Sequence, residues 1–120
     1  MNFYDHPIQV SYRFPAASLT GGAATFGRFI GPAGKTGRLL SLTTIVTTSV
    51  TVAAATVILG AAGVNGSMTV PISSANAGLS ATAAQIKAAT NIVADAVTTV
   101  GTNGAATAGA ADVVVSIGWF

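Results

Sequence analysis

Residues 37–60 read GRLLSLTTIVTTSVTVAAATVILG, and the structure that this stretch adopts decides the fold of the whole chain. Between Leu40 and Val52 the even-numbered positions are mostly apolar, and the odd-numbered positions mostly carry hydroxyl groups. A period of two is typical of a β-strand with one buried face. Val, Ile and Thr are also stiff at χ1 and suit a pleated surface better than a helix. We therefore expect the stretch to form β-structure.

The alternative for this stretch is a membrane-spanning helix, which needs about 20 predominantly apolar residues. Ser and Thr at almost every second position give such a helix no advantage, so we favour strands. One strand over 38–52 would be about 50 Å long, more than twice the usual length of a strand. We therefore expect a strand near 38–47, a connection near 48–53 and a second strand near 54–59.

The composition limits the classes of protein to which the chain can belong. Its 120 residues have the size of one domain, and the absence of cysteine excludes disulfides and thiolate sites. Charged residues make up 7% of the chain, against about 25% in a typical soluble domain. A surface so poor in charge suits a protein that packs against other proteins. The net charge of +2 is too small to indicate nucleic-acid binding.

The rest of the chain also has the pattern of short strands separated by turns. Pro15 is expected to end the first strand, Gly27 to form a bulge, and Ser80 to cap one short helix within 81–90. Trp119 and Phe120 are expected to anchor the core as large apolar side chains. The further strands are predicted at 8–14, 24–30, 67–72, 91–100 and 111–120, with turns or loops at 31–37, 61–66 and 101–109.

Seven or eight such strands predict an all-β, single-domain antiparallel β-sandwich or barrel over residues 8–120. Residues 1–7, MNFYDHP, precede it and are predicted to form an extended N-terminal arm. These residues lack the basic start and apolar core of a secretory signal. We therefore expect the protein to be made and used without crossing a membrane by that route.

No combination of residues predicts catalysis, a cofactor or a metal site. The sequence GPAGKT at 31–36 resembles a phosphate-binding loop, but the required earlier Gly is replaced by Phe29 and a strand is expected to follow. The acidic residues are Asp5, Asp95 and Asp112, and the one histidine is His6. Their separation in the sequence indicates neither a carboxylate pair nor a triad. We expect a protein that is not an enzyme.

Two groups of residues are candidates for binding a partner. Arg28, Lys35 and Arg38 flank the 31–37 loop, and they form either a solvated loop or a docking patch for an acidic surface. Phe3 and Tyr4 in the arm either cover the protein's own core or insert into a neighbouring protein as anchors. The candidate partner-binding residues are Phe3, Tyr4, His6, Arg28, Lys35 and Arg38.

Residues 31–60, GPAGKTGRLLSLTTIVTTSVTVAAATVILG, and the closing AGAADVVVSIGWF at 108–120 together resemble the capsid decoration proteins of tailed bacteriophages, also called cement or auxiliary head proteins. The resembling features are the Gly-rich loop, the GRLL strand, the TTSVTV connection and the Val-rich last strand ending in Trp-Phe. The resemblance implies a compact β-sandwich, often a jelly roll. It also implies a structural protein without catalytic residues.

The resemblance further implies where the protein acts and with what. Decoration proteins bind the outside of the phage head as oligomers, bridge neighbouring major capsid subunits and resist the pressure of packaged DNA. The expected partners are therefore the major capsid protein and further copies of this chain, as a dimer or trimer, with no nucleic acid and no membrane. The expected location is the exterior of the capsid in the virion, after synthesis in the host cytoplasm.

Two other functions stay open at this point. A carbohydrate- or receptor-binding β-sandwich module of a virion fibre would need exposed aromatic side chains on a sheet face. A small membrane protein such as a holin would need residues 37–60 to form a helix.

Overall fold

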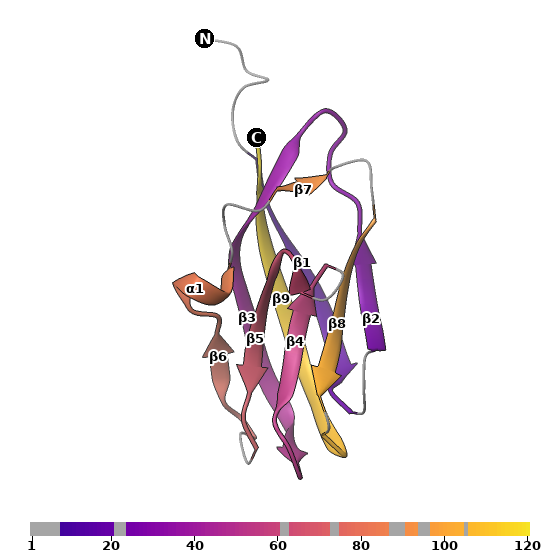
Figure 1. Ribbon diagram of the computed structural model, residues 1–120, viewed down its shortest axis with the longest axis vertical. Helices are drawn as coiled ribbons and strands as arrows, with labels where there is room; N and C mark the ends of the chain where they lie inside the picture. Colours follow the sequence, from indigo (N-terminus) through magenta and orange to yellow (C-terminus); the bar gives the residue numbers. More distant parts are fainter. Residues whose placement is uncertain are drawn as a thin grey trace.

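The computed structural model is a sandwich of two antiparallel β-sheets, and it describes residues 8–20, 24–60, 63–72, 75–86, 91–93, 97–104 and 106–120 (Figure 1). In chain order the elements are β1 (Ile8–Ser18), β2 (Ala24–Phe29), β3 (Thr36–Thr51), β4 (Ala55–Leu59), β5 (Gly66–Val70), β6 (Gly78–Ser80), α1 (Ala83–Ile86), β7 (Ile92–Val93), β8 (Thr98–Gly104) and β9 (Ala108–Trp119).

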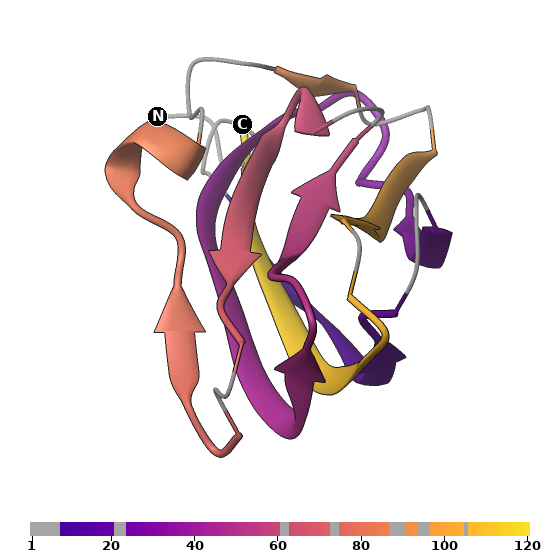
Figure 2. The ribbon, with the colours of Figure 1, turned by 60° about the horizontal axis from the view of Figure 1, so that its bottom comes forward.

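The two sheets have the strand order of a jelly roll. One sheet runs β1-β9-β3-β6, with β7 also paired to β3, and the other runs β2-β8-β4-β5. Apart from β7, each sheet therefore has four strands, and the first strand of the chain lies beside the last. Figure 2 shows the two layers packed face to face. The all-β sandwich predicted from the sequence is confirmed.

The core lies between the sheets and is filled by alternate residues of each strand. In β9 the side chains of Val113, Val115 and Ile117 are buried, as the alternation predicted. Full burial of a Val or Ile side chain contributes about 1.5–3 kcal/mol. The same period of two appears in β4 and β5, whose buried core residues are Ala55, Val57, Leu59, Met68 and Val70.

The long apolar stretch forms two strands, but the break between them is shorter than expected. β3 continues to Thr51, so the connection predicted at 48–53 was wrong, and only 52–54 separate β3 from β4. Register shifts between Leu39 and Ser41, and again after Val46, let this long strand follow its partner β9. The first shift also changes which leucine faces the core. The alternation had placed Leu40 on the apolar face, but Leu39 is buried and Leu40 is 44% exposed.

The first strand does not end at Pro15. β1 continues to Ser18, with a register shift between Phe14 and Ala17. Because β1 is an edge strand, a proline at a bulge interrupts no pairing on its outer side. The bulge expected at Gly27 is confirmed by the register shift between Thr25 and Gly27.

The region after residue 80 departs most from the sequence-based expectation. The predicted strand at 91–100 is divided between the sheets, because β7 pairs with β3 and β8 pairs with β2 and β4. Most of the flexible tip predicted at 101–109 is strand. The short helix is confirmed as α1, but Thr82 rather than Ser80 caps it: the amide of Gln85 donates to the Thr82 hydroxyl at 3.4 Å, and the Thr82 amide donates to Gln85 Oε1 at 2.9 Å.

Candidate partner-binding surface

Three of the six candidate residues, Phe3, Tyr4 and His6, lie outside the described residues, as does the whole predicted arm at 1–7. The structure does place the residue that follows the arm. Ile8, the first residue of β1, pairs with Trp119 near the end of β9. The described chain therefore begins at the same end of the sandwich at which it finishes (Figure 1).

The Gly-rich loop between β2 and β3 lies at this end too. The Thr36 amide donates to the carbonyl of Phe120, and the Phe120 amide donates to the carbonyl of Thr36, both at 2.9 Å. Gly37 is the register partner of Trp119. We call the end that carries Ile8, residues 30–37 and Phe120 the Trp119 end.

The glycines of this loop make room for the Trp119 side chain. Trp119 is fully buried, and a Cβ atom built on Gly37 would lie 2.6 Å from its ring, with one built on Gly31 closer still. Phe29 packs edge-on against the same indole, with ring centroids 6.4 Å apart. Packing against Trp119 therefore explains why two positions of the loop are glycine. A phosphate-binding role is not needed to explain them.

Phe120 does not anchor the core as predicted. Its side chain is 56% exposed, because successive residues of a strand point to opposite faces and Trp119 occupies the inner one. A Cβ built on Gly118 would lie 3.3 Å from both Leu40 and Phe120, so these two apolar side chains flank the same glycine. They form an exposed apolar surface at the Trp119 end.

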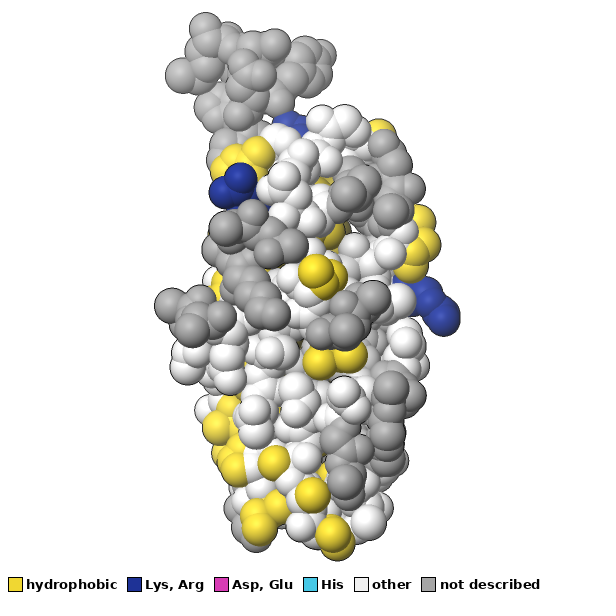
Figure 3. Space-filling model, viewed as in Figure 1, with side chains coloured by type: hydrophobic (Ala, Val, Ile, Leu, Met, Phe, Trp, Pro, Cys, Tyr) yellow, Lys and Arg dark blue, Asp and Glu magenta, His cyan; other side chains and the backbone are white. Residues whose placement is uncertain are grey.

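The basic candidates do not form one patch. Arg28 and Arg38 are both exposed and each precedes a buried core residue, but β2 and β3 belong to different sheets. Their side chains therefore point away from the core on opposite sides of the sandwich. Lys35 is half-buried and lies in the loop at the Trp119 end, next to the start of β3. The basic side chains visible in Figure 3 are correspondingly separate from one another.

A hollow of about 500 Å³ lies at the Trp119 end and is lined by Thr36, Arg38, Asn91 and Phe120. A guanidinium, an amide and a hydroxyl group here surround an exposed aromatic ring. This set can bind a ligand's carboxylate, amide or hydroxyl groups while the ring contacts an apolar part. The sequence singled out Arg38 as a binding residue but not Asn91 or Phe120, because only the pairing of β7 and β9 with β3 brings these residues together.

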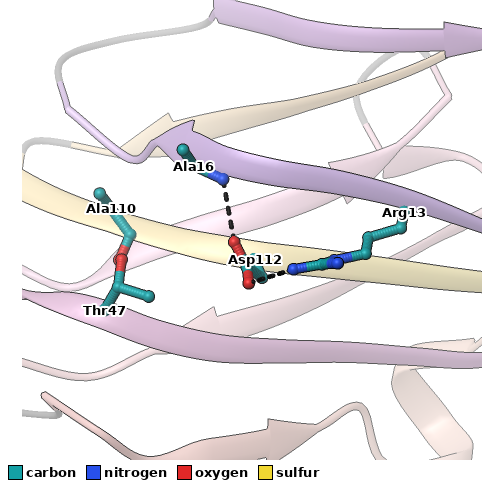
Figure 4. Close-up of polar contacts among 5 residues, drawn as sticks. All are labelled: Arg13, Ala16, Thr47, Ala110 and Asp112. Atoms are coloured by element: carbon teal, nitrogen blue, oxygen red, sulfur yellow. Dashed lines mark hydrogen bonds and ion pairs between the residues drawn. The ribbon is translucent and has the colours of Figure 1, made fainter.

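Asp112 forms an ion pair with Arg13 in the outward face of the β1–β9 sheet (Figure 4). Arg13 donates to Asp112 Oδ2 at 2.9 Å, and the backbone amide of Ala16 donates to Oδ1 at 2.9 Å. The Ala16 hydrogen bond, and then the Arg13 bond, lower the pKa of Asp112 from its ordinary value of 3.8. The carboxylate therefore holds the bulge of β1 against β9, which is a structural role.

The remaining carboxylates, Asp5 and Asp95, lie outside the described residues. Within the part of the chain that the structure describes, no group of three or more His, Asp or Glu side chains is placed to hold a metal ion. The same part contains no helix with the length and apolar character of a membrane span. Because residues 37–60 form β3 and β4, the alternative of a membrane helix in this stretch is wrong.

Comparison with known proteins adds little to this surface. No family model and no curated protein sequence matches the chain. Among solved structures, the chain is similar to a protein of the Bacillus endospore appendages, which form a family of disulfide-linked pili. The two share 13% sequence identity at a TM-score of 0.45, and the likeness covers 95% of this chain and 86% of the other.

Proposed function

We propose that this chain is a non-enzymatic structural protein of a bacteriophage virion, which binds the outside of the capsid and stabilises contacts between major capsid subunits. One observation carries the proposal: the residue that follows the arm, the Gly-rich loop and the hollow with Arg38 all lie at the Trp119 end. A single face there combines apolar anchors with hydrogen-bond donors. That combination is typical of a protein–protein interface.

In this proposal the arm and the Trp119 end act together on the capsid. Phe3 and Tyr4 insert as aromatic anchors, and the basic groups of Lys35 and Arg38 meet an acidic capsid surface. The sandwich itself serves as a rigid body, because its sheets share one continuous core. The chain acts as a dimer or trimer, so that its copies bind neighbouring capsid subunits and hold them together.

Deletion of residues 1–7 tests the arm's part in binding. The expected result is a folded domain whose affinity for capsids of the phage that encodes it falls on the order of a thousandfold, because two aromatic anchors of about 2 kcal/mol each are lost. Co-sedimentation with capsids that lack the protein measures the affinity, and circular dichroism measures folding. Unchanged capsid binding by the folded variant would show that the arm does not contribute to binding.

A pair of arginine variants tests which face meets the capsid. Arg38→Ala removes a guanidinium from the hollow at the Trp119 end, and Arg28→Ala removes one from the opposite side of the sandwich. If the Trp119 end is the capsid-facing surface, Arg38→Ala weakens capsid binding more than Arg28→Ala does. The reverse order would place the docking surface on the sheet that contains β2.

The hollow also favours a second candidate function, a carbohydrate- or receptor-binding module of a virion fibre. The exposed ring of Phe120 beside the polar groups of Thr36, Arg38 and Asn91 resembles a sugar-binding arrangement, in which a ring stacks on the sugar and polar groups bind its hydroxyls. Specific binding on a glycan array, abolished by Phe120→Ala, would support this function over capsid binding.

A further inference from the structure

The hollow at the Trp119 end lies on the outward face of three paired strands, β7, β3 and β9. Ile92 and Trp119 flank Gly37 in this sheet, and both of these side chains are buried. Because successive residues of a strand point to opposite faces, the neighbouring residues Arg38 and Asn91 face outward. The antiparallel register that pairs Gly37 with Ile92 also places Asn91 directly across from Arg38.

On its other side, Arg38 pairs with Gly118 of β9. Gly118 has no side chain, so the sheet surface beside the guanidinium stays open. Leu40 and Phe120 border this open surface, since a Cβ built on Gly118 would lie 3.3 Å from each of them. The hollow therefore has polar groups from Arg38 and Asn91 next to an apolar border.

Hydrogen bonds hold the residues of the hollow in place. Thr36 and Phe120 exchange two backbone hydrogen bonds, both at 2.9 Å. The buried side chain of Asn65 donates from Nδ2 to the carbonyl of Asn91 at 3.3 Å, which fixes the backbone at the start of β7. A site whose backbone is fixed before binding loses less entropy when a ligand enters it.

The guanidinium of Arg38 has no carboxylate partner within the ranges that the structure describes. Asp112 is the one acidic residue in those ranges, and Arg13 pairs with it. A guanidinium is planar and can bind both oxygens of a carboxylate at once, and its single charge balances that of one carboxylate. Phosphate sites ordinarily combine several backbone N–H groups, and a neutral sugar would leave the guanidinium charge without a counter-charge. The hollow therefore suits a carboxylate.

We propose that the hollow binds one acidic side chain, Asp or Glu, of the capsid protein, while an apolar neighbour of that residue packs on Leu40 and Phe120. The choice of the capsid protein as the source of the carboxylate rests on the proposed function. Arg38 binds both carboxylate oxygens, and the groups of Thr36 and Asn91 hydrogen-bond to the polar atoms around it. The contact between the two proteins then depends on one residue of the capsid surface rather than on its overall charge.

Peptide binding to the purified full chain tests this site without capsids. Acetyl-Glu-Leu-amide carries the acidic and the apolar side chain, and we expect a dissociation constant on the order of 1 mM. Acetyl-Gln-Leu-amide has the same size without the charge and should bind at least tenfold more weakly. Nuclear magnetic resonance measures both affinities, and the side-chain NH signals of Arg38 and Asn91 should shift with the acidic peptide alone.

Arg38→Lys separates the shape of the guanidinium from its charge. Lysine keeps the charge but cannot bind both carboxylate oxygens in one plane, so this variant should bind the acidic peptide about tenfold more weakly. Arg13→Lys is the matched control on the same face of the sheet. Because Asp112 already pairs with the Arg13 guanidinium, this variant is expected to bind the peptide like the unchanged chain.

The double variant Asp5→Asn/Asp95→Asn tests whether the chain's own carboxylates occupy the hollow. We expect unchanged peptide affinity, and a tenfold gain would overturn the proposal. So would no binding at about 20 mM peptide, well above the expected dissociation constant, or equal affinity for the two peptides. Tighter binding of methyl glucuronide than of the acidic peptide would also overturn it, because the carboxylate would then come from a glycan.

Co-sedimentation of the unchanged chain with capsids separates this inference from the proposed function. Capsid binding without peptide binding would overturn the carboxylate site and leave the capsid function standing. Peptide binding that depends on Arg38, without any capsid binding, would overturn the capsid protein as the source of the carboxylate.

Discussion

At the scale of single residues, Gly31 and Gly37 are fixed by the indole of Trp119. A methyl group at Gly31 would overlap the ring, and Trp119 has no room to move within the core. We expect Gly31→Ala to lower the free energy of unfolding by about 1–3 kcal/mol, the usual cost of overpacking. Urea denaturation followed by the fluorescence of Trp119, the one tryptophan of the chain, measures the change.

Gly78→Ala is the control for this substitution. A Cβ built on Gly78 has no heavy atom within 4 Å, so its effect on unfolding should stay within about 0.5 kcal/mol. Equal stabilities of the two variants would show that the loop does not pack on Trp119 in solution. Gly31, Gly37 and Trp119 can all be read from the sequence, but the sequence does not indicate that they are in contact. Their contact depends on the pairing of β3 with β9.

At the scale of a strand, the bulge in β1 holds Ala16 at a φ of 52°. Ala pays about 1–2 kcal/mol for a left-handed backbone, and Gly adopts it without steric cost but loses more entropy on folding. We therefore expect Ala16→Gly to raise the free energy of unfolding by about 0.5–1 kcal/mol. A thermal melt with the Ala17→Gly variant beside it gives the comparison.

Ala17 is the neighbouring residue, but it is buried and paired with Ala111 of β9. Ala17→Gly should lower the melting temperature, because it removes a buried methyl group and loosens the strand. If both alanine variants lower the melting temperature alike, the bulge of β1 does not hold Ala16 as described.

The strands themselves show which features the sequence could predict. The period of two located β1, β2, β4, β5 and β9, because it reflects which face of each strand is buried. It failed at Leu40 and Pro15, because a bulge shifts the period by one residue and depends on the partner strand. It also failed at 91–100, where β7 and β8 join different sheets and tertiary pairing alone sets the boundary.

At the scale of the whole molecule, the two ends of the sandwich differ in a way that no local pattern reveals. The sequence shows Phe120 but not its exposure, since the expectation there was a core anchor, and the jelly-roll order decides which segments meet at which end. The hollow with Arg38 and Asn91 arises in the same way, from residues far apart in the sequence. Sequence reasoning therefore found the fold class and one residue of the hollow.

A molecule with so few charges should also show a simple dependence of stability on pH. The folded structure lowers the pKa of Asp112 below its ordinary value of 3.8, so this carboxylate adds stability above about pH 4 and loses it as the pH falls through the folded pKa. We expect the urea midpoint of the unchanged chain to fall from about pH 5 downward. The Asp112→Asn variant should be less stable at neutral pH and should lose less on acidification, since it keeps no charge to be protonated.

The difference between these two pH curves isolates Asp112 from Asp5, Asp95 and the chain termini, which titrate in both proteins. The Arg13→Gln variant is a second measure, because it removes the ion pair but leaves the hydrogen bond from the Ala16 amide, which is the larger cause of the lowered pKa. Its curve should lie between the other two. Parallel curves for the unchanged chain and Asp112→Asn would show that the link from β9 to the bulge of β1 contributes nothing to the pH dependence.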